Sequence, residues 1–286
     1  MARRSVLFSP GDQPELMRKA PETGADTIVF DLEDAVAPGR KDEARDAVAN
    51  VLTDPSFDPD CEVCVRINPD QELAAADIET IFAGDGRLDT VMFSKVESKA
   101  DVERQYDLIR TRGRELPVIG LCESAQGILS AEEIAAAAPV DAVAFGAEDL
   151  SADIGATRTE SGEEVSYARQ HVVLAAGAAG IDAIDTVFTD IKETDRLAEE
   201  TAFARRLGYD GKLAIHPAQV EVINEAFTPD TDDVAWAKRV LKAVADAEST
   251  QRGVFRIDDE MIDAPLIARA ENIMDRYQAA DDDLQN

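Results

Sequence analysis

The sequence contains no apolar run of the length that crosses a lipid bilayer. Crossing requires roughly 20 consecutive apolar residues, whereas this 286-residue chain is 45% hydrophobic and disperses its apolar residues among polar ones. The first residues, MARRSVLFSPGDQPELM, also lack a long apolar stretch that ends in a small-residue cleavage site. We therefore expect a globular, cytoplasmic protein with no membrane partner.

Basic residues are scarce as well. The chain has 29 Lys and Arg against 59 Asp and Glu, a formal net charge of -30. Such a surface repels nucleic acids and anionic membranes, which argues against both as partners. The acids are spread through the chain, as in DPSFDPD, ESGEEV and TPDTDDV, and Lys is scarcer than Arg. This pattern favours a halophilic protein with a solvated acidic shell; an ordinary acidic cytosolic protein is the alternative.

Cysteine and histidine are rare too. Cys61, Cys64 and Cys122 suit a reducing compartment. Cys61 and Cys64 form a C-x-x-C, but CEVCVRIN has the pattern of a strand, in which residues three apart point to opposite faces, and no second Cys pair completes a zinc site. We interpret all three as core or surface thiols. His216, with only His171 elsewhere in the sequence, is interpreted as a hydrogen-bonded structural residue.

Eight apolar segments of strand length alternate with segments of helical spacing. The predicted strands are 5–10, 27–34, 62–68, 90–96, 117–124, 141–149, 183–188 and 212–217, and the clearest helices are 41–52, 99–113, 130–138, 163–180 and 193–208. Near-continuous apolar strands are typical of a parallel sheet covered on both faces. The alternation predicts an α/β fold, either a (β/α)8 TIM barrel or an open doubly wound sheet.

Polar residues decide between these two folds, because they gather at the carboxyl ends of the predicted strands. In a TIM barrel all these ends meet at one mouth, where the active sites of this fold lie. We therefore favour the barrel, with a catalytic domain over 1–228. The residues concerned are Ser9, Asp31, Glu33, Asp34, Arg66, Asn68, Lys95, Glu123, Glu148, Asp149 and His216.

The remaining segment, 229–286, has the pattern of a helix, a short β-loop and a second helix. We expect it to be too small for a core of its own. It would then pack as a lid-like extension on the barrel or contribute to a neighbouring subunit's site.

Glu123 and Asp149 are carboxylates at the ends of adjacent predicted strands. Oxygen ligands of this kind, with room for water and substrate, suit Mg²⁺ or Mn²⁺. Capping of the helix that follows each strand explains each residue nearly as well.

The whole pattern resembles the citrate lyase β-subunit family, which includes malyl-CoA, methylmalyl-CoA and citramalyl-CoA lyases within the HpcH/HpaI-type aldolases. The matching motifs follow the family's order over nearly the full chain. They are RRSVLFSPG, DLEDAVAPGRKDEAR, VRIN, SKVES, ESAQGI, FGAEDL, GYDGKLAIHPAQV and FRIDDEMIDAPLIARA.

The resemblance implies a role for each matching position. Glu123 and Asp149 would bind Mg²⁺ or Mn²⁺, and Arg66 would grip the reacting carbonyl with two parallel donors. Asp263 would transfer a proton across a subunit boundary, which requires a homo-oligomer such as a trimer or hexamer. The implied substrate and CoA contacts are Phe8, Glu33, Asp34, the backbone of Gly146, Ala147 and Glu148, and, near the thioester, Arg4 and Pro10.

These roles imply reversible, Mg²⁺-dependent cleavage of a β-hydroxyacyl-CoA into acetyl-CoA or propionyl-CoA and glyoxylate or pyruvate. Arg66 would stabilise the thioester enolate, and Asp263 would protonate its carbon. In the alternative readings, Asp263 only begins a helix ahead of Pro265 and Arg66 forms a strand-end salt bridge.

Three rival functions use the same fold. A Schiff-base aldolase would use Lys95 or Lys212. A malyl-CoA thioesterase would hydrolyse the thioester at the same site. A citrate lyase β subunit would act on an acyl-carrier-protein thioester, although the motif after residue 250 resembles the free-standing CoA lyases.

The acidic composition predicts that salt stabilises the fold. The Debye length grows from about 3 Å at 1 M to about 10 Å at 0.1 M salt, so self-repulsion increases as salt is removed. We expect the free energy of unfolding in urea to fall over this range. Unchanged stability at low salt would contradict the halophilic interpretation.

Overall fold

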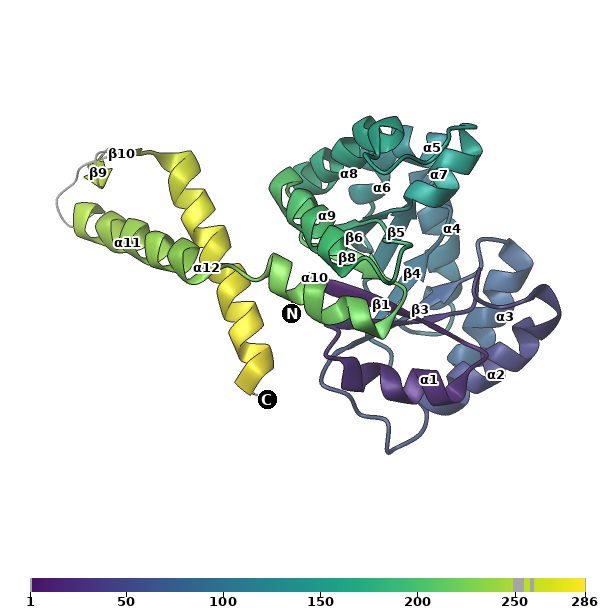
Figure 1. Ribbon diagram of the computed structural model, residues 1–286. Helices are drawn as coiled ribbons and strands as arrows, with labels where there is room; N and C mark the ends of the chain where they lie inside the picture. Colours follow the sequence, from purple (N-terminus) through teal and green to yellow (C-terminus); the bar gives the residue numbers. More distant parts are fainter. Residues whose placement is uncertain (1, 249–254, 258–259, 286) are drawn as a thin grey trace. The chain divides into compact units, whose positions relative to one another are not determined.

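The computed structural model describes residues 2–248, 255–257 and 260–285 and divides the chain into two compact units (Figure 1). The first, which we call the barrel unit, is Arg3–Glu225. The second, the C-terminal unit, begins at Ala226, slightly before the boundary expected at residue 229.

Eight parallel strands close into a barrel in the order β1 to β8, with β8 paired to β1. This confirms the predicted (β/α)8 architecture over the open sheet. The strands are β1 (Ser5–Pro10), β2 (Thr27–Asp31), β3 (Glu62–Ile67), β4 (Thr90–Phe93), β5 (Val118–Cys122), β6 (Val140–Phe145), β7 (Asp182–Asp185) and β8 (Gly211–Ala214).

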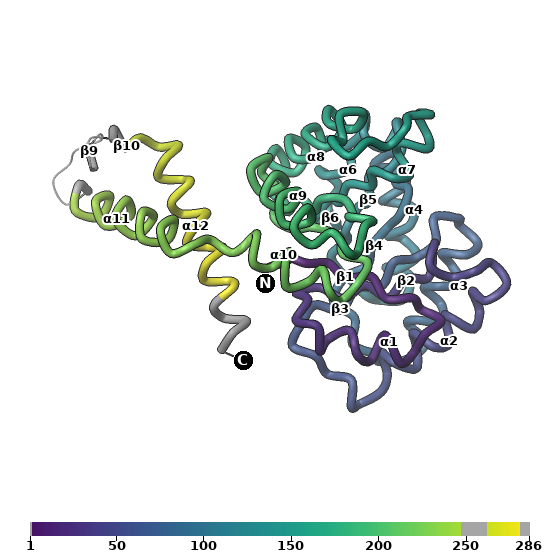
Figure 2. The backbone as a smooth tube through the Cα atoms, viewed as in Figure 1, coloured from purple at the N-terminus to yellow at the C-terminus, as the bar shows by residue number. Residues whose placement is uncertain are grey.

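Helices surround these strands, as the ribbon and the backbone tube both show (Figures 1 and 2). The predicted helices over 41–52 and 193–208 are confirmed as α2 and α9, and α8 and α9 end at Gly180 and Gly208, both with positive φ. The helices are α1 (Pro14–Lys19), α2 (Lys41–Leu52), α3 (Gln71–Ile81), α4 (Lys99–Arg110), α5 (Ala125–Leu129), α6 (Ala131–Ala135), α7 (Ala147–Asp153), α8 (Ser166–Ala179), α9 (Thr194–Leu207) and α10 (Val220–Phe227), with 3-10 turns η1 (Ala20–Thr23), η2 (Pro38–Arg40), η3 (Glu163–Val165) and η4 (Pro217–Gln219).

An apolar cluster from all eight strands fills the barrel. Its members are Val6, Val29, Cys64, Met92, Ile119, Leu121, Ala142, Ala144, Ile184 and Leu213. Cys64 is thus a core thiol, and Cys61 is only partly buried, which agrees with the sequence interpretation. Burial raises the pKa of Cys61 to about 11 and that of Cys122 to about 12, so both stay protonated and unreactive near neutral pH.

A partly buried arginine, Arg3, lies at the amino-terminal end of the barrel. The Arg3 guanidinium donates two hydrogen bonds to Glu62, at 2.8 and 2.7 Å, and one each to Asp141 and Asp182, at 2.8 and 3.4 Å. One side chain therefore joins β3, β6 and β7. Burial tends to raise the pKa of Glu62, but Arg3 outweighs it and holds that pKa below its usual value.

The C-terminal unit contains α11 (Thr231–Glu248), the antiparallel strands β9 (Phe255–Ile257) and β10 (Glu260–Ile262), and α12 (Ala264–Gln285). This order matches the expected helix, β-loop and helix. The unit forms its own apolar cluster, so the expectation that it is too small for a core of its own is wrong. The reason is that α11 and α12 are long enough to bury a shared face. The cluster is Val234, Ala237, Val240, Ile262, Ala270 and Ile273. Within the described part of the chain, no helix is long and apolar enough to span a membrane.

Replacing Arg3 with Met should destabilise the barrel by about 3–5 kcal/mol, because Glu62 would remain buried without its cation. The loss of stability should be largest at neutral pH and shrink as pH falls. Without Arg3, burial raises the pKa of Glu62, so Glu62 becomes protonated as pH falls and no longer places an unpaired buried charge in the folded state. Urea unfolding at neutral pH and at acidic pH measures this difference in the free energy of unfolding. Arg18→Met, which removes an exposed pair with Asp54, is the control and should cost about 0–1 kcal/mol; an equal loss in both variants would contradict the assignment.

Candidate active site

The carboxyl-terminal end of the barrel holds buried charged side chains. Asp31 ends β2, Arg66 lies near the end of β3, and Glu123 directly follows β5. Their exposed fractions are 1%, 8% and 3%. Asp149 lies in the first turn of α7 after β6 and is exposed. The barrel therefore gathers at one end residues that are far apart in the sequence.

Arg66 is fixed by Asp31. Its Nε and Nη2 donate to the two Asp31 carboxylate oxygens at 2.7 and 2.6 Å, and its guanidinium carbon lies 4.6 Å from the centre of the Phe8 ring. Burial opposes its charge, but Asp31 and Glu33 raise the pKa of Arg66 above its ordinary value, so it stays charged. One two-donor edge of Arg66 is thus already occupied, which limits the pair of donors expected for substrate to the other edge.

Asp31 also shapes the loop that follows β2. Its carboxylate accepts hydrogen bonds from the backbone N–H groups of Glu33 and Ala35 at 2.8 and 2.9 Å. Lys41 Nζ donates to the carbonyls of Leu32 and Glu33 at 2.7 and 2.6 Å. These bonds end β2 at Asp31, three residues before the predicted end, and put Glu33 in a fixed loop.

Lys95 connects this loop to Glu123. Its Nζ lies 2.7 Å from Glu33 Oε1 and 3.7 Å from Asp34 Oδ1, and its backbone N–H donates to Glu123 Oε1 at 2.9 Å. Burial lowers the pKa of Lys95, but the bond to Glu33 and the charge of Asp34 outweigh burial and raise that pKa to about 12. An amine held protonated in this way is a poor Schiff-base nucleophile.

Lys212 lies outside the barrel interior. Its neighbour Leu213 belongs to the interior cluster, and successive strand residues face opposite sides. The Lys212 Nζ is 2.5 Å from Asp185, which Arg169 also binds with two hydrogen bonds of 2.8 Å. Burial lowers the pKa of Lys212, but its ammonium is engaged by Asp185 on the outer side of the strand, away from the barrel interior.

Glu123 is a buried carboxylate among other acids. Burial, with the charges of Glu33 and Asp149, raises the pKa of Glu123 to about 8. A divalent cation nearby would offset the repulsion between Glu123, Glu33 and Asp149. These carboxylates therefore fit a metal that takes one or two protein carboxylates. Among the described residues no three His, Cys, Asp or Glu side chains form a metal-holding group, so water and substrate would complete the shell.

Gly146 leaves the space that Glu123 occupies. A Cβ at position 146 would lie 2.4 Å from the Glu123 Cβ and 2.9 Å from its Oε2. The glycine of the FGAED motif is therefore needed for the position of the carboxylate that directly follows the neighbouring strand β5.

The predicted carboxylate cradle is partly occupied by the protein itself. The Gly146 N–H donates to the Cys122 carbonyl at 3.1 Å, and the Ala147 N–H donates to Thr186 Oγ1 at 3.0 Å. A ligand carboxylate would have to replace Thr186 as the acceptor at Ala147. Thr186 was not among the predicted site residues, because the predicted strand 183–188 runs past it, whereas β7 ends at Asp185.

Three other predicted residues lie in different places. Pro10 ends β1 at the same end as Arg66. Arg4 precedes β1, at the opposite end of the strands, where its backbone N–H and Nε each donate to Asp26 at 2.8 Å. The assignment of Arg4 to the thioester is therefore wrong, because the whole length of β1 separates it from the mouth. Asp263 is an exposed residue of the C-terminal unit, and its carbonyl accepts from the first turn of α12.

His216 acts as a structural residue, as interpreted from the sequence. Its Nδ1 accepts a hydrogen bond from the Ala218 N–H at 3.1 Å and caps the turn η4.

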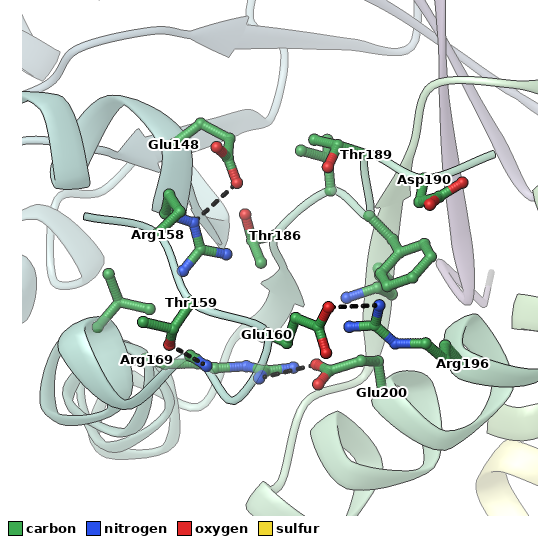
Figure 3. A pocket seen from close by; sticks show the side chains of 15 residues that line it. Glu148, Arg158, Thr159, Glu160, Arg169, Thr186, Thr189, Asp190, Arg196 and Glu200 are labelled. Atoms are coloured by element: carbon green, nitrogen blue, oxygen red, sulfur yellow. Dashed lines mark hydrogen bonds and ion pairs between the residues drawn. The ribbon is translucent and has the colours of Figure 1, made fainter. Parts of the chain in front are cut away.

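A cavity of about 240 Å³ lies beside the site, between the loops that follow β6 and β7 (Figure 3). Glu148 and Thr186 line it together with several cations. These cations are paired with acids: Arg158 with Glu148, Arg196 with Glu160, and Arg169 with Glu200.

Gly146→Ala should weaken divalent-cation binding by about 10- to 100-fold, because the new methyl group displaces a predicted ligand. Calorimetric titration with Mg²⁺ or Mn²⁺ measures the change. Gly177→Ala is the matched control, since its Cβ would meet nothing within 4 Å. Equal cation affinity in both variants would refute the role of Glu123.

Comparison with known proteins identifies the family. Residues 4–217 match the family described as HpcH/HpaI aldolase/citrate lyase. The chain is 37% identical to the mitochondrial citramalyl-CoA lyase of Rattus norvegicus over 289 residues, covering 95% of this chain and 85% of that protein. It is 36% identical to the citrate lyase subunit beta of Haemophilus influenzae, covering 97% of both chains.

A solved structure agrees with the same assignment. The protein CitE from Mycobacterium tuberculosis, in complex with magnesium, acetoacetate and coenzyme A, matches with a TM-score of 0.80 and 36% identity over 97% of this chain and 98% of that one. On this evidence the chain belongs to the HpcH/HpaI aldolase/citrate lyase family.

Proposed function

We propose that this chain is a Mg²⁺-dependent carbon–carbon lyase. It reversibly cleaves a β-hydroxyacyl-CoA into acetyl-CoA or propionyl-CoA and a 2-oxo acid. The observation that carries the proposal is the charged Arg66, locked by Asp31 at the barrel mouth beside the buried acid Glu123. The citramalyl-CoA lyase relative and the neighbour bound to magnesium and coenzyme A support it.

Glu123 and Asp149 would hold the cation, with Mn²⁺ as an alternative to Mg²⁺. When bound, Mg²⁺ acts as a Lewis acid toward the substrate hydroxyl that becomes the oxo group. Glu33 and Asp34 border this position. The Glu33 carboxylate is itself held by Lys95 and can orient water at the mouth.

Arg66 has the second role. In the cleavage, the hydroxyl would give its proton to water at the mouth, its oxygen would become the 2-oxo group, and the electron pair of the broken carbon–carbon bond would pass to the thioester as an enolate. The edge of Arg66 that Asp31 does not bind, whose Nη1 now lies 3.1 Å from Glu33 Oε2, would stabilise this negative charge. The Phe8 ring packs against the plane of the Arg66 guanidinium. Pro10 lies at the end of β1, at the same end of the barrel as Arg66.

The 2-oxo acid's carboxylate would bind at the backbone of Gly146, Ala147 and Glu148. In this arrangement the carboxylate takes the place of Thr186 Oγ1 as the acceptor of the Ala147 N–H. Thr186 then remains beside it as a hydroxyl donor.

Protonation of the enolate carbon is assigned to Asp263 of a neighbouring subunit in a homotrimer or homohexamer. Asp263 is exposed in the single chain, and its carboxylate accepts one long hydrogen bond of 3.4 Å from the Leu266 N–H, which another subunit's site would have to replace. We also infer a cytoplasmic protein adapted to high salt from the dispersed acidic residues.

The substrate is malyl-CoA, methylmalyl-CoA or citramalyl-CoA. These differ by methyl groups, each worth about 1–3 kcal/mol of discrimination in an apolar pocket. Similarity to a citramalyl-CoA lyase favours citramalyl-CoA. A second candidate is a citrate lyase β subunit, because the Haemophilus influenzae relative matches over 97% of its own length. The segment after residue 250 therefore does not separate the two.

An assay of the three CoA thioesters with Mg²⁺ at high salt tests the proposal. We expect equal amounts of acyl-CoA and 2-oxo acid, and loss of both in Glu123→Gln. Free CoA and hydroxy acid without a 2-oxo acid would indicate a thioesterase instead. Activity only after addition of carrier and transferase subunits would indicate a citrate lyase β subunit.

Mg²⁺ binding should depend on pH. The pKa of Glu123 is raised to about 8 without the metal, so below that pH the cation must displace a proton. The apparent affinity should fall by about tenfold for each pH unit below the pKa and reach a plateau above it. Calorimetry from about pH 6 to 9 in two buffers would also detect the released proton. A flat profile below the pKa would contradict Glu123 as a ligand.

Asp263→Asn should retain Mg²⁺ binding and lower turnover by about 10²- to 10⁴-fold, because a carboxamide cannot exchange the proton. Asp275→Asn, at another exposed position of α12, is the control. Mixing inactive Asp263→Asn and Glu123→Gln subunits should restore activity if Asp263 acts across the interface. Full activity of Asp263→Asn alone would eliminate the assignment.

A further inference from the structure

Lys95 has a backbone conformation that its side chain disfavours. Among the described residues it is the only non-glycine with a positive φ, 51°. An L-residue in the left-handed region crowds its Cβ against the backbone, whereas glycine adopts it freely. Such conformations persist where surrounding contacts enforce them, and they concentrate at functional sites.

This conformation lets Lys95 bind two acids, Glu123 through its backbone N–H and Glu33 through its ammonium. The backbone N–H donates to Glu123 Oε1 at 2.9 Å, and the ammonium lies 2.7 Å from Glu33 Oε1. Glycine would provide the same N–H without strain. The reason for a lysine at this position must therefore lie in its ammonium group.

The ammonium fixes Glu33 between two cations. Glu33 is 4% exposed, and its Oε2 has no hydrogen-bond partner, although it lies 3.1 Å from Arg66 Nη1. That contact is an ion pair without the angle of a hydrogen bond. Lys95 thus supplies the directional bond to Glu33 and holds this carboxylate beside the Arg66 edge that Asp31 leaves free.

We infer that Lys95 is a positioning residue with two separable actions. Its left-handed backbone aims Glu123 at the cation site, and its ammonium holds Glu33 against Arg66. This inference rests on the proposed lyase function for its effect on turnover, but not for its effect on cation binding.

Three variants separate the two actions. Lys95→Gly keeps the left-handed backbone and removes the ammonium. Lys95→Val removes the ammonium and also disfavours a positive φ. Lys95→Arg keeps a cation. Lys99→Ala, at an exposed lysine of α4 with a 3.8 Å ion pair to Glu103, is the control.

Mg²⁺ affinity, measured by calorimetry without substrate, tests the backbone action. We expect Lys95→Gly to bind Mg²⁺ nearly as well as the parent chain and Lys95→Val to bind about tenfold more weakly. Melting temperatures identify a variant that fails to fold, and Lys95→Gly should melt above Lys95→Val. Equal Mg²⁺ affinity of the two folded variants would overturn the backbone action, whether or not the chain is a lyase.

The steady-state rate tests the ammonium. We expect Lys95→Gly to lower kcat/KM by about 10- to 100-fold and Lys95→Arg to recover most of it. The loss should disappear when Glu33→Gln is already present, because Lys95 would act through Glu33. Unchanged kcat/KM in Lys95→Gly, or an equal loss with and without Glu33→Gln, would overturn this action. An inactive parent chain would instead refute the proposed function.

Discussion

The site depends on the buried ion pair between Asp31 and Arg66. Asp31 accepts four hydrogen bonds, two from Arg66 and two from the backbone of the following loop. A buried carboxylate with all its acceptor positions occupied leaves little freedom to either partner. The same pair therefore decides where β2 ends, how the loop that carries Glu33 is held, and which edge of Arg66 faces a ligand.

The two ends of the barrel differ in how their charges are balanced. At the amino-terminal end, Arg3 pairs with Glu62, Asp141 and Asp182 and holds the pKa of Glu62 below its usual value. At the other end, burial together with the charges of Glu33 and Asp149 raises the pKa of Glu123. The first arrangement stabilises the fold, and the second leaves a site that a divalent cation and an anionic substrate can complete. The acids of this second end are Asp31, Glu33, Asp34, Glu123 and Asp149, against Lys41, Arg66 and Lys95.

Much of the fold was predictable because its signals are local. Strand length, helical spacing and terminal glycines such as Gly180 and Gly208 depend on neighbouring residues, and all eight strands lie where expected. The gathering of Arg66 and Glu123 followed from the parallel direction of the strands. The strand ends were placed too late, because side-chain bonds such as those of Asp31 end β2 and local hydrophobicity does not record them. Thr186 was missed because its partner, the Ala147 N–H, is 39 residues away.

The sequence by itself determined the order of the elements, the barrel and the types of residue at the strand ends. Only the tertiary structure decided which way those residues face. Lys95 enters the site and Lys212 points away from the barrel interior, and Arg4 lies at the end opposite Arg66. For Lys212 the physical reason is that strand side chains alternate with a period of two, so a shift of one residue exchanges inside for outside. Lys95 and Arg4 lie just outside β4 and β1, so their places depend on where each strand begins or ends. Closure of the barrel fixes that register through pairs between strands, such as Asp31 with Arg66, and such pairs are not local in the sequence.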